Sequence, residues 1–171
     1  MKSLLNAKSA YIDRLPKGTL FALKRYGVDT MFGIKLSAPE DQPNNKPKIL
    51  LLNPQFGHER DAHRHLVTIW EADERCISLG EDWVIDPIFT AEAISDLNEP
   101  QANAALTIGP AGMHFRCASG EGARLMYRHH IHVDTLEPAN NLDNSAFHLT
   151  GYRLYLSKED VALGREPVFK L

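Results

Sequence analysis

Cysteine is scarce in this chain of 171 residues, which contains only Cys76 and Cys117. Two thiols cannot build the scaffold of several disulfides that stabilises small secreted domains. We expect both cysteines to be reduced side chains in the hydrophobic core, and a single bridge between them is the alternative.

A large excess of charge is absent too, because the formal net charge is -3 and the isoelectric point is about 6.2. A chain with this balance has no general cationic field, which disfavours nucleic acid and anionic lipid as partners. The first apolar run ends at Asn6 and Lys8, too soon for a secretory signal or a transmembrane segment. The sequence therefore predicts a cytoplasmic protein that does not enter a membrane.

Strong catalytic motifs are missing as well. The chain has no phosphate-binding P-loop, no GxSxG nucleophile elbow with a triad and no paired CxxC motifs. Covalent nucleophilic catalysis has no support from these patterns. The sequence leaves open whether the protein is an enzyme.

Short stretches with strand character are plentiful. Apolar residues at helical spacing predict an N-terminal helix over residues 3–14, which Pro16 ends. Strands are predicted over 19–26, 29–37, 49–53, 65–72, 75–80, 82–87, 104–109, 112–118, 123–135 and 147–156. The spacing of the strands between residues 65 and 87 is typical of a meander. The fold class that follows is mainly β: one domain over residues 1–171, forming an antiparallel β-barrel or sandwich.

One or two short helices complete this prediction. Thr90 is placed to cap a helix over residues 91–97. Ser157 and Asp160 fit the cap and the third position of a second helix, which Gly164 ends, and the last five residues are predicted to add an edge strand.

Histidine and arginine alternate with apolar residues in the two stretches 112–118 and 123–135. If these form a hairpin, period-two alternation collects polar side chains on one face and apolar ones on the other, provided that the loop has an odd number of residues. His129 falls on the apolar face, where a hydrogen-bonded core histidine is expected. The candidate ligand-binding residues on the polar face are Arg116, Arg128, His130, His132 and Asp134. A solvated sheet face without a ligand is the alternative.

Two HxH pairs, His63 with His65 and His130 with His132, have the spacing at which two imidazoles on a strand can chelate one ion. Gly57, His63 and His65 also resemble the first motif of the cupin family, and His114 with the preceding glycine is similar to a shortened second motif. The resemblance implies a β-barrel whose metal ligands are His63, His65 and His114. The cofactor would then be a divalent first-row metal such as iron, manganese, nickel or zinc. In that motif a glutamate follows more closely than Glu71 does here. An exposed charged loop before a strand is the other interpretation.

His148 and Thr150 are similar to one half of the paired HxT motif of the two-histidine phosphoesterases. Those enzymes need a second HxT so that two histidines can act as acid and base. His65 with Thr68 and His132 with Thr135 have one residue more between them, which places the hydroxyl on the opposite face of a strand. This spacing argues against that family.

Two functions from different classes remain. The first is a non-catalytic module that binds a small molecule or a protein partner. The second is a metal-dependent enzyme of the cupin-like β-barrel type. An oligomer of identical chains is compatible with either function.

Overall fold

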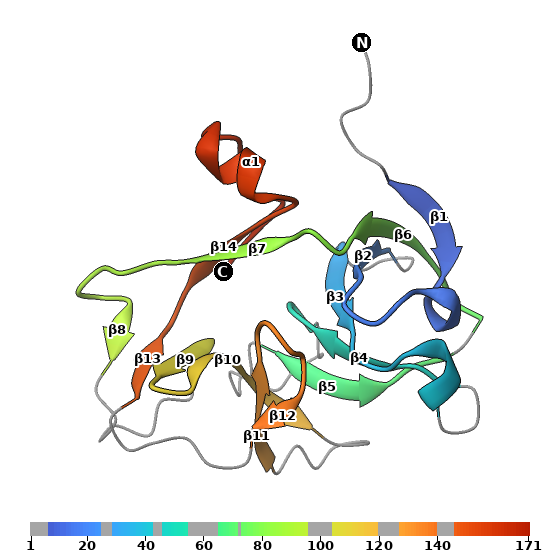
Figure 1. Ribbon diagram of the computed structural model, residues 1–171, viewed down its shortest axis with the longest axis horizontal. Coiled ribbons are helices and arrows are strands. Elements are labelled where there is room, and N and C mark those ends of the chain that lie inside the picture. Colours follow the sequence, from blue (N-terminus) through green and yellow to red (C-terminus); the bar gives the residue numbers. More distant parts are fainter. Residues whose placement is uncertain are drawn as a thin grey trace.

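A computed structural model describes residues 7–24, 29–42, 46–54, 65–71, 73–95, 104–119, 127–139 and 146–171. Within these ranges the protein is mainly β (Figure 1). The strands are β1 Lys8–Tyr11, β2 Leu20–Leu23, β3 Met31–Lys35, β4 Lys48–Leu51, β5 Leu66–Ile69, β6 Arg75–Gly80, β7 Val84–Pro87, β8 Ile94–Ser95, β9 Leu106–Gly109, β10 Gly112–Ser119, β11 Tyr127–His132, β12 Pro138–Ala139, β13 Phe147–Leu149, β14 Tyr152–Tyr155 and β15 Phe169–Lys170. Two 3-10 turns, Ile12–Arg14 and Pro39–Asp41, and one α-helix, α1 Lys158–Ala162, accompany them.

The strands form two sheets. Sheet A has 12 strands, in the order β1-β6-β2-β3-β4-β5-β10-β9-β13-β8, with β11 and β12 joined to the other side of β10. Sheet B has three strands in the order β15-β14-β7. Neither sheet closes on itself among the described strands, so the barrel form of the prediction is wrong. Pairing is antiparallel except between β5 and β10, which run parallel.

The two sides of β10 explain why sheet A stays open. One side pairs with β11 along most of its length, while the other pairs first with β9 and then with β5. A strand shared between three neighbours joins two arms of the sheet at an angle. In Figure 1 one arm of the sheet curves strongly on the right; we call it the curved arm, and it consists of β1, β6, β2, β3, β4 and β5. The strands β8, β9 and β13 lie on the left.

Both faces of β4, in the curved arm, are buried. Along β4, Ile49 and Leu51 belong to one buried cluster, and Leu50 belongs to another. The second cluster includes Phe115 from sheet A and Tyr152 from sheet B. Burial on both faces explains why β2 and β4 have continuous apolar sequences, LFAL and ILL, instead of alternating ones.

A close contact between β2 and β3 shows how the curved arm packs. Phe21 lies opposite Gly33, and a Cβ at Gly33 would come within 2.5 Å of the Phe21 ring. Lys35, at the end of β3, is fully buried, and its ammonium donates hydrogen bonds to the carbonyl oxygens of Asp13 and Leu15, each at 3.2 Å. These bonds satisfy carbonyls at the first 3-10 turn, although burial still lowers the pKa of the amine.

The predicted N-terminal helix is wrong where the structure describes it. Residues Lys8–Tyr11 form β1, which pairs with β6, and a 3-10 turn follows. The apolar residues that suggested a helix, Ile12 and Leu15, are buried in the cluster inside the curved arm. The 3-10 turn brings both side chains into this cluster. Pairing of β1 with β6 therefore outweighs the local helical pattern.

The predicted meander is wrong as well, because β5, β6 and β7 do not pair with one another. Strand β5 pairs with β4 and β10, β6 pairs with β1 and β2, and β7 pairs with β14 in sheet B. The turn residues correctly mark the ends of the strands, but they carry no information about the partner of each strand.

Helix prediction fails at one site and holds at another. The amide of Ala93 donates to Thr90 Oγ1 at 3.2 Å, as the cap requires, yet only a turn forms before Ile94–Ser95 pairs with β13. Near the C-terminus, Ser157 Oγ accepts from the Asp160 amide at 3.2 Å, and α1 and the edge strand β15 follow as predicted.

Candidate functional site

A row of polar side chains crosses four neighbouring strands of sheet A. His148 of β13 lies opposite Thr107 of β9, Thr107 lies opposite His114 of β10, and His114 lies opposite His132 of β11. Directly opposed residues on antiparallel strands project to the same face, with Cβ atoms about 5 Å apart. The register therefore places three histidines and a threonine side by side.

A second row lies two residues further along the same strands. Arg116 of β10 is opposite His130 of β11, which is opposite Ala139 of β12. Because two residues along a strand return to the same face, Arg116 and His130 share the face of His114 and His132. We call the six residues Thr107, His114, Arg116, His130, His132 and His148 the histidine face. None of them is acidic.

The faces of this hairpin agree with the predicted alternation. Phe115, Cys117 and Ile131 are buried in the core on one side. The loop between the paired residues Ser119 and Tyr127 has an odd number of residues, as this phase requires.

His114 is nevertheless deeply buried, with 1% of its surface exposed. Its ring contacts the ring of His132 edge to face, with 4.9 Å between the centroids. No described group forms a hydrogen bond with His114 Nδ1. Burial lowers the pKa of His114, and the neighbouring His132 lowers it further. A hydrogen bond with the Gly112 backbone raises this pKa, but by less. His114 is therefore a neutral imidazole near neutral pH, and its Nδ1 has no hydrogen-bond partner among the described residues.

His132 uses both ring nitrogens to hold the chain on each side of it. Nδ1 accepts hydrogen bonds from the amides of Asp134 and Thr135, at 3.1 and 3.4 Å. This pattern places the proton on Nε2, which lies 3.2 Å from the carbonyl oxygen of Ala111. His132 thus joins the turn after β11 to the turn before β10.

The absence of a side chain at Gly112 leaves room for the His132 ring. Its φ angle is +102°, and a Cβ at this position would lie 2.8 Å from His132 Nε2. Only glycine allows both the backbone conformation and the approach of the ring.

Thr107 and His148 extend the row on its other side. Thr107 is fully buried, and its hydroxyl lies 3.0 Å from His148 Nδ1. Neither residue was among the predicted site residues. The signal that could have identified them is the strand pairing of β9 with both β10 and β13, which single-sequence alternation does not reveal.

The other predicted ligand-binding residues are placed differently. Asp134 is exposed in the turn after β11, beyond the two rows. Arg128 lies opposite Ala118 in the β10–β11 pairing, which puts its backbone two residue pairs beyond Arg116 and His130. The side chains of Arg128 and His129 lie outside the described part of the chain.

The predicted metal ligands do not come together where the structure describes them. His65 is buried in the core, with Nδ1 3.0 Å from the carbonyl oxygen of Arg116 and Nε2 2.9 Å from the hydroxyl of Tyr152. It packs against the ring of Phe115, on the face of β10 opposite to His114. His63 lies outside the described residues. Across the described ranges, no three His, Cys, Asp or Glu side chains gather closely enough to hold a metal ion.

Both cysteines are buried and reduced, as predicted. Burial raises the pKa of Cys76 to about 11 and that of Cys117 to about 12. Both thiols therefore stay protonated near neutral pH, which makes them poor nucleophiles.

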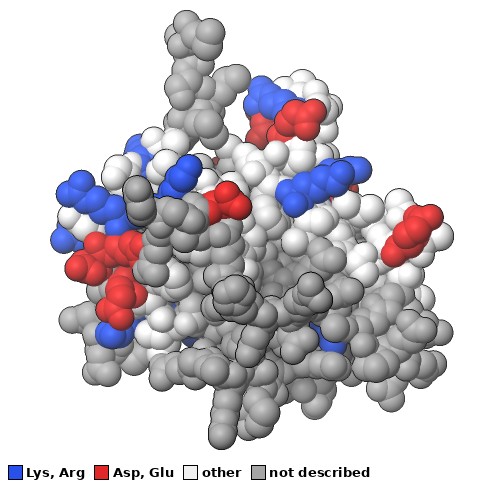
Figure 2. Space-filling view, turned by 180° about the vertical axis from the view of Figure 1, so that it is seen from behind, with Lys and Arg blue, Asp and Glu red and all other residues white. Residues whose placement is uncertain are grey.

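Charged side chains are mixed over the face of the molecule shown in Figure 2. Lysine and arginine are interspersed there with aspartate and glutamate among the described residues. Among the described residues on this face, neither sign of charge forms a separate patch. None of the helices in the described ranges has the length and apolar character needed to cross a bilayer.

Comparison with protein-family models, curated proteins and solved structures finds no match to this chain. A functional assignment must therefore rest on the geometry of the histidine face and on the cavities of the fold.

Proposed function

We propose that the protein is a non-catalytic binding module whose histidine face takes a small oxyanion, a molecule with a carboxylate or phosphate group. The observation that supports this role is the register that puts Arg116 beside His130 and His114 beside His132 on one face. A guanidinium donates strong charge-assisted hydrogen bonds to such oxygens. The face itself contributes no carboxylate that would repel them.

Exposure of the side chains supports the same role. Arg116, His130 and His132 are half-buried, so part of each side chain is open to solvent, although Nε2 of His130 is buried. His114 is buried beside His132. The half-buried guanidinium of Arg116 interacts with an anion more strongly than a fully solvated one would, because water screens it less.

The architecture proposed for this module is sandwich-like, with sheet B packed over part of sheet A. The larger buried cluster contains side chains from both sheets, including Phe115 and Leu154. We propose a single domain in which this core holds the histidine face rigid.

Titration of isotope-labelled protein with orthophosphate and with citrate tests the proposal. At constant ionic strength, with chloride as the reference anion, we expect the NMR signals of Arg116, His130 and His132 to shift in a saturable way. Replacing Arg116 with Gln should weaken binding about tenfold or more, since a charge-assisted hydrogen bond contributes about 1.5–3 kcal/mol. Circular dichroism should show that the variant keeps its fold.

Arg153→Gln is the matched control, because Arg153 is a half-exposed strand arginine in sheet B, paired with Asp86. It should bind the oxyanions like the unmodified protein. Equal affinity of Arg116→Gln would contradict the proposal. Stoichiometric metal in protein purified without a histidine tag, lost on replacing His114, would favour the metal-dependent enzyme instead.

A further inference from the structure

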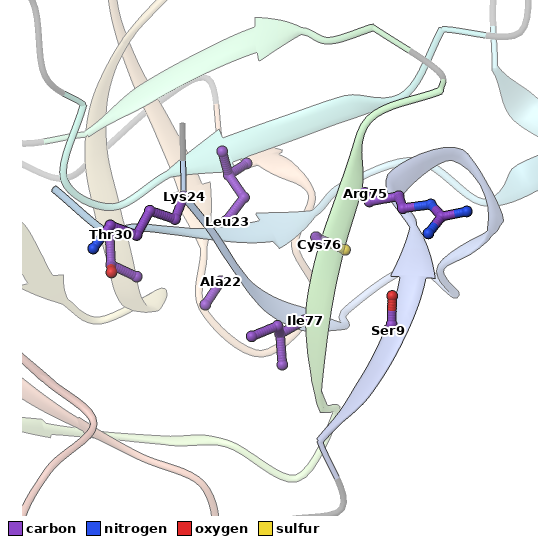
Figure 3. A pocket seen from close by; sticks show the side chains of 8 residues that line it. All are labelled: Ser9, Ala22, Leu23, Lys24, Thr30, Arg75, Cys76 and Ile77. Atoms are coloured by element: carbon purple, nitrogen blue, oxygen red, sulfur yellow. The ribbon is translucent and has the colours of Figure 1, made fainter. Parts of the chain in front are cut away.

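A cavity lies on the outer face of the curved arm, and none of the residues that line it belongs to the histidine face. Its volume is about 310 Å³, enough for about ten water-sized groups. In Figure 3 Ala22 and Ile77 lie in the middle, Lys24 and Thr30 at one end, and Ser9 and Arg75 at the other. Strands β1, β6 and β2 supply most of these residues.

Register explains the hollow. Ser9 lies opposite Ile77 and Ile77 lies opposite Ala22, so these three side chains project to the same face. Ala22 is the smallest apolar side chain of the row, and it leaves space between larger neighbours. Ile77 is 50% exposed, which leaves an apolar surface open to a ligand.

The polar groups that line the cavity are cations and hydroxyls. Among the described residues that line the cavity, the ionisable side chains are Lys24, Arg75 and the Cys76 thiol, and none is acidic. The raised pKa of Cys76 keeps that thiol neutral. A ligand complementary to this lining has an apolar part and a negative charge.

Arg75 is held in place before any ligand arrives. Its Nε and Nη2 donate to the hydroxyl of Tyr11 at 3.2 and 3.1 Å, and its guanidinium lies over the Tyr11 ring at 5.2 Å from the centroid. Further N–H groups of the fork remain for a second acceptor. Because the side chain is already ordered, binding an anion there costs less conformational entropy than at a mobile lysine.

We propose that this cavity binds a small amphiphilic carboxylate, with its apolar tail over Ala22 and Ile77 and its carboxylate on Arg75. The inference is independent of the function proposed for the histidine face.

NMR titration with octanoate, a carboxylate with an apolar tail, tests this site. We expect saturable shifts of the Ala22 and Ile77 signals, with at least tenfold weaker binding of octanol and octylammonium. Arg75→Gln should weaken octanoate binding about tenfold, whereas Lys24→Gln should change it less than about threefold. Ala22→Leu, which fills the hollow while keeping both cations, should abolish binding.

Because the histidine face is also proposed to take carboxylates, the control is read only at the cavity. Arg116→Gln should leave the octanoate-induced shifts of the Ala22 and Ile77 signals unchanged, which separates the two sites. Thermal melting of each variant shows whether the fold persists. Octanol binding as tightly as octanoate, an unaffected Ala22→Leu variant, or a larger loss from Lys24→Gln than from Arg75→Gln would each overturn the proposal.

Discussion

Histidine takes several distinct roles at the scale of single residues in this protein. His65 and His132 have both ring nitrogens within hydrogen-bond distance of protein groups, one in the core and one between two turns. His114 is as buried as His65, but its Nδ1 has no described partner. A buried nitrogen without a hydrogen-bond partner is costly, and the cost is greater when the imidazole is charged.

The first prediction concerns the stability of the protein at mildly acidic pH. The folded state lowers the pKa of His114 below 6.5, so below that pH the unfolded chain binds a proton that the folded chain resists. The free energy of unfolding should therefore fall as pH drops from about 6.5 towards the lower folded-state pKa. Denaturation with urea at a series of pH values measures this slope.

His114→Gln should flatten that slope, because glutamine does not titrate. Thr107→Val is the matched control, since it removes a buried neighbouring hydroxyl without removing a titrating group. The assignment to His114 fails if the slope is unchanged in the glutamine variant or if the valine variant flattens it equally.

At the scale of elements, the β10–β11 hairpin is held by side-chain contacts with the neighbouring turns as well as by the pairing of its strands. His132 links the turns at residues 110–111 and 133–135 through its ring. Gly112, at the start of β10, leaves the space that the ring needs. The position of His132 on the histidine face therefore depends on the absence of a side chain at residue 112.

The second prediction compares two glycines. Gly112 and Gly80 have similar φ angles of +102° and +97°, but a Cβ at Gly80 would meet no atom within 4 Å. Gly80→Ala should lower the free energy of unfolding by about 1–3 kcal/mol through backbone strain alone. Gly112→Ala should cost more, because the new methyl group also displaces His132.

Urea denaturation gives both free energies, and the NMR signals of the His132 ring report its displacement. Equal losses in the two variants, with unchanged His132 signals, would show that the ring adjusts without cost.

At the scale of the whole molecule, one sheet contributes to two buried clusters. Leu50 faces the cluster that includes residues of sheet B, and Leu51 faces the cluster inside the curved arm. They are 0% and 2% exposed, although they are adjacent in the same strand. A sheet with one wet face would leave one of them in water.

The third prediction follows from this double burial. Leu50→Ala and Leu51→Ala should each lower the free energy of unfolding by about 2–5 kcal/mol, because each opens a cavity in a packed cluster. Ile69→Ala in the neighbouring strand is the control, since Ile69 is 45% exposed, and it should cost less than about 1 kcal/mol. A near-neutral effect of either leucine variant would mean that one of the two clusters is loosely packed.

Sequence patterns predicted the local features that depend on neighbours along the chain. Phe115, Cys117 and Ile131 face the core as alternation indicated, and Ser157 caps α1. The same patterns failed where a distant strand competes. Lys8–Tyr11 joined β6 instead of a helix, and Ile94–Ser95 joined β13.

Some residues of the candidate site are predictable from local periodicity, and others are not. His114, Arg116, His130 and His132 were assigned to one face from two-residue periodicity, and the register confirms that placement. Thr107 and His148 could not be predicted, because they join the face only through the pairing of β9 with β10 and β13.

The amino-acid sequence by itself determined the mainly β class, the two reduced cysteines and the faces on which the described side chains of the β10–β11 hairpin lie. These properties follow from side-chain hydrophobicity and from the two-residue repeat of a strand. Only the tertiary structure decided which strands are neighbours, that sheet A remains open, and that His114 is buried beside His132. Backbone hydrogen bonds between strands are nearly the same for any pair, so the partner is selected by the packing of the complete core.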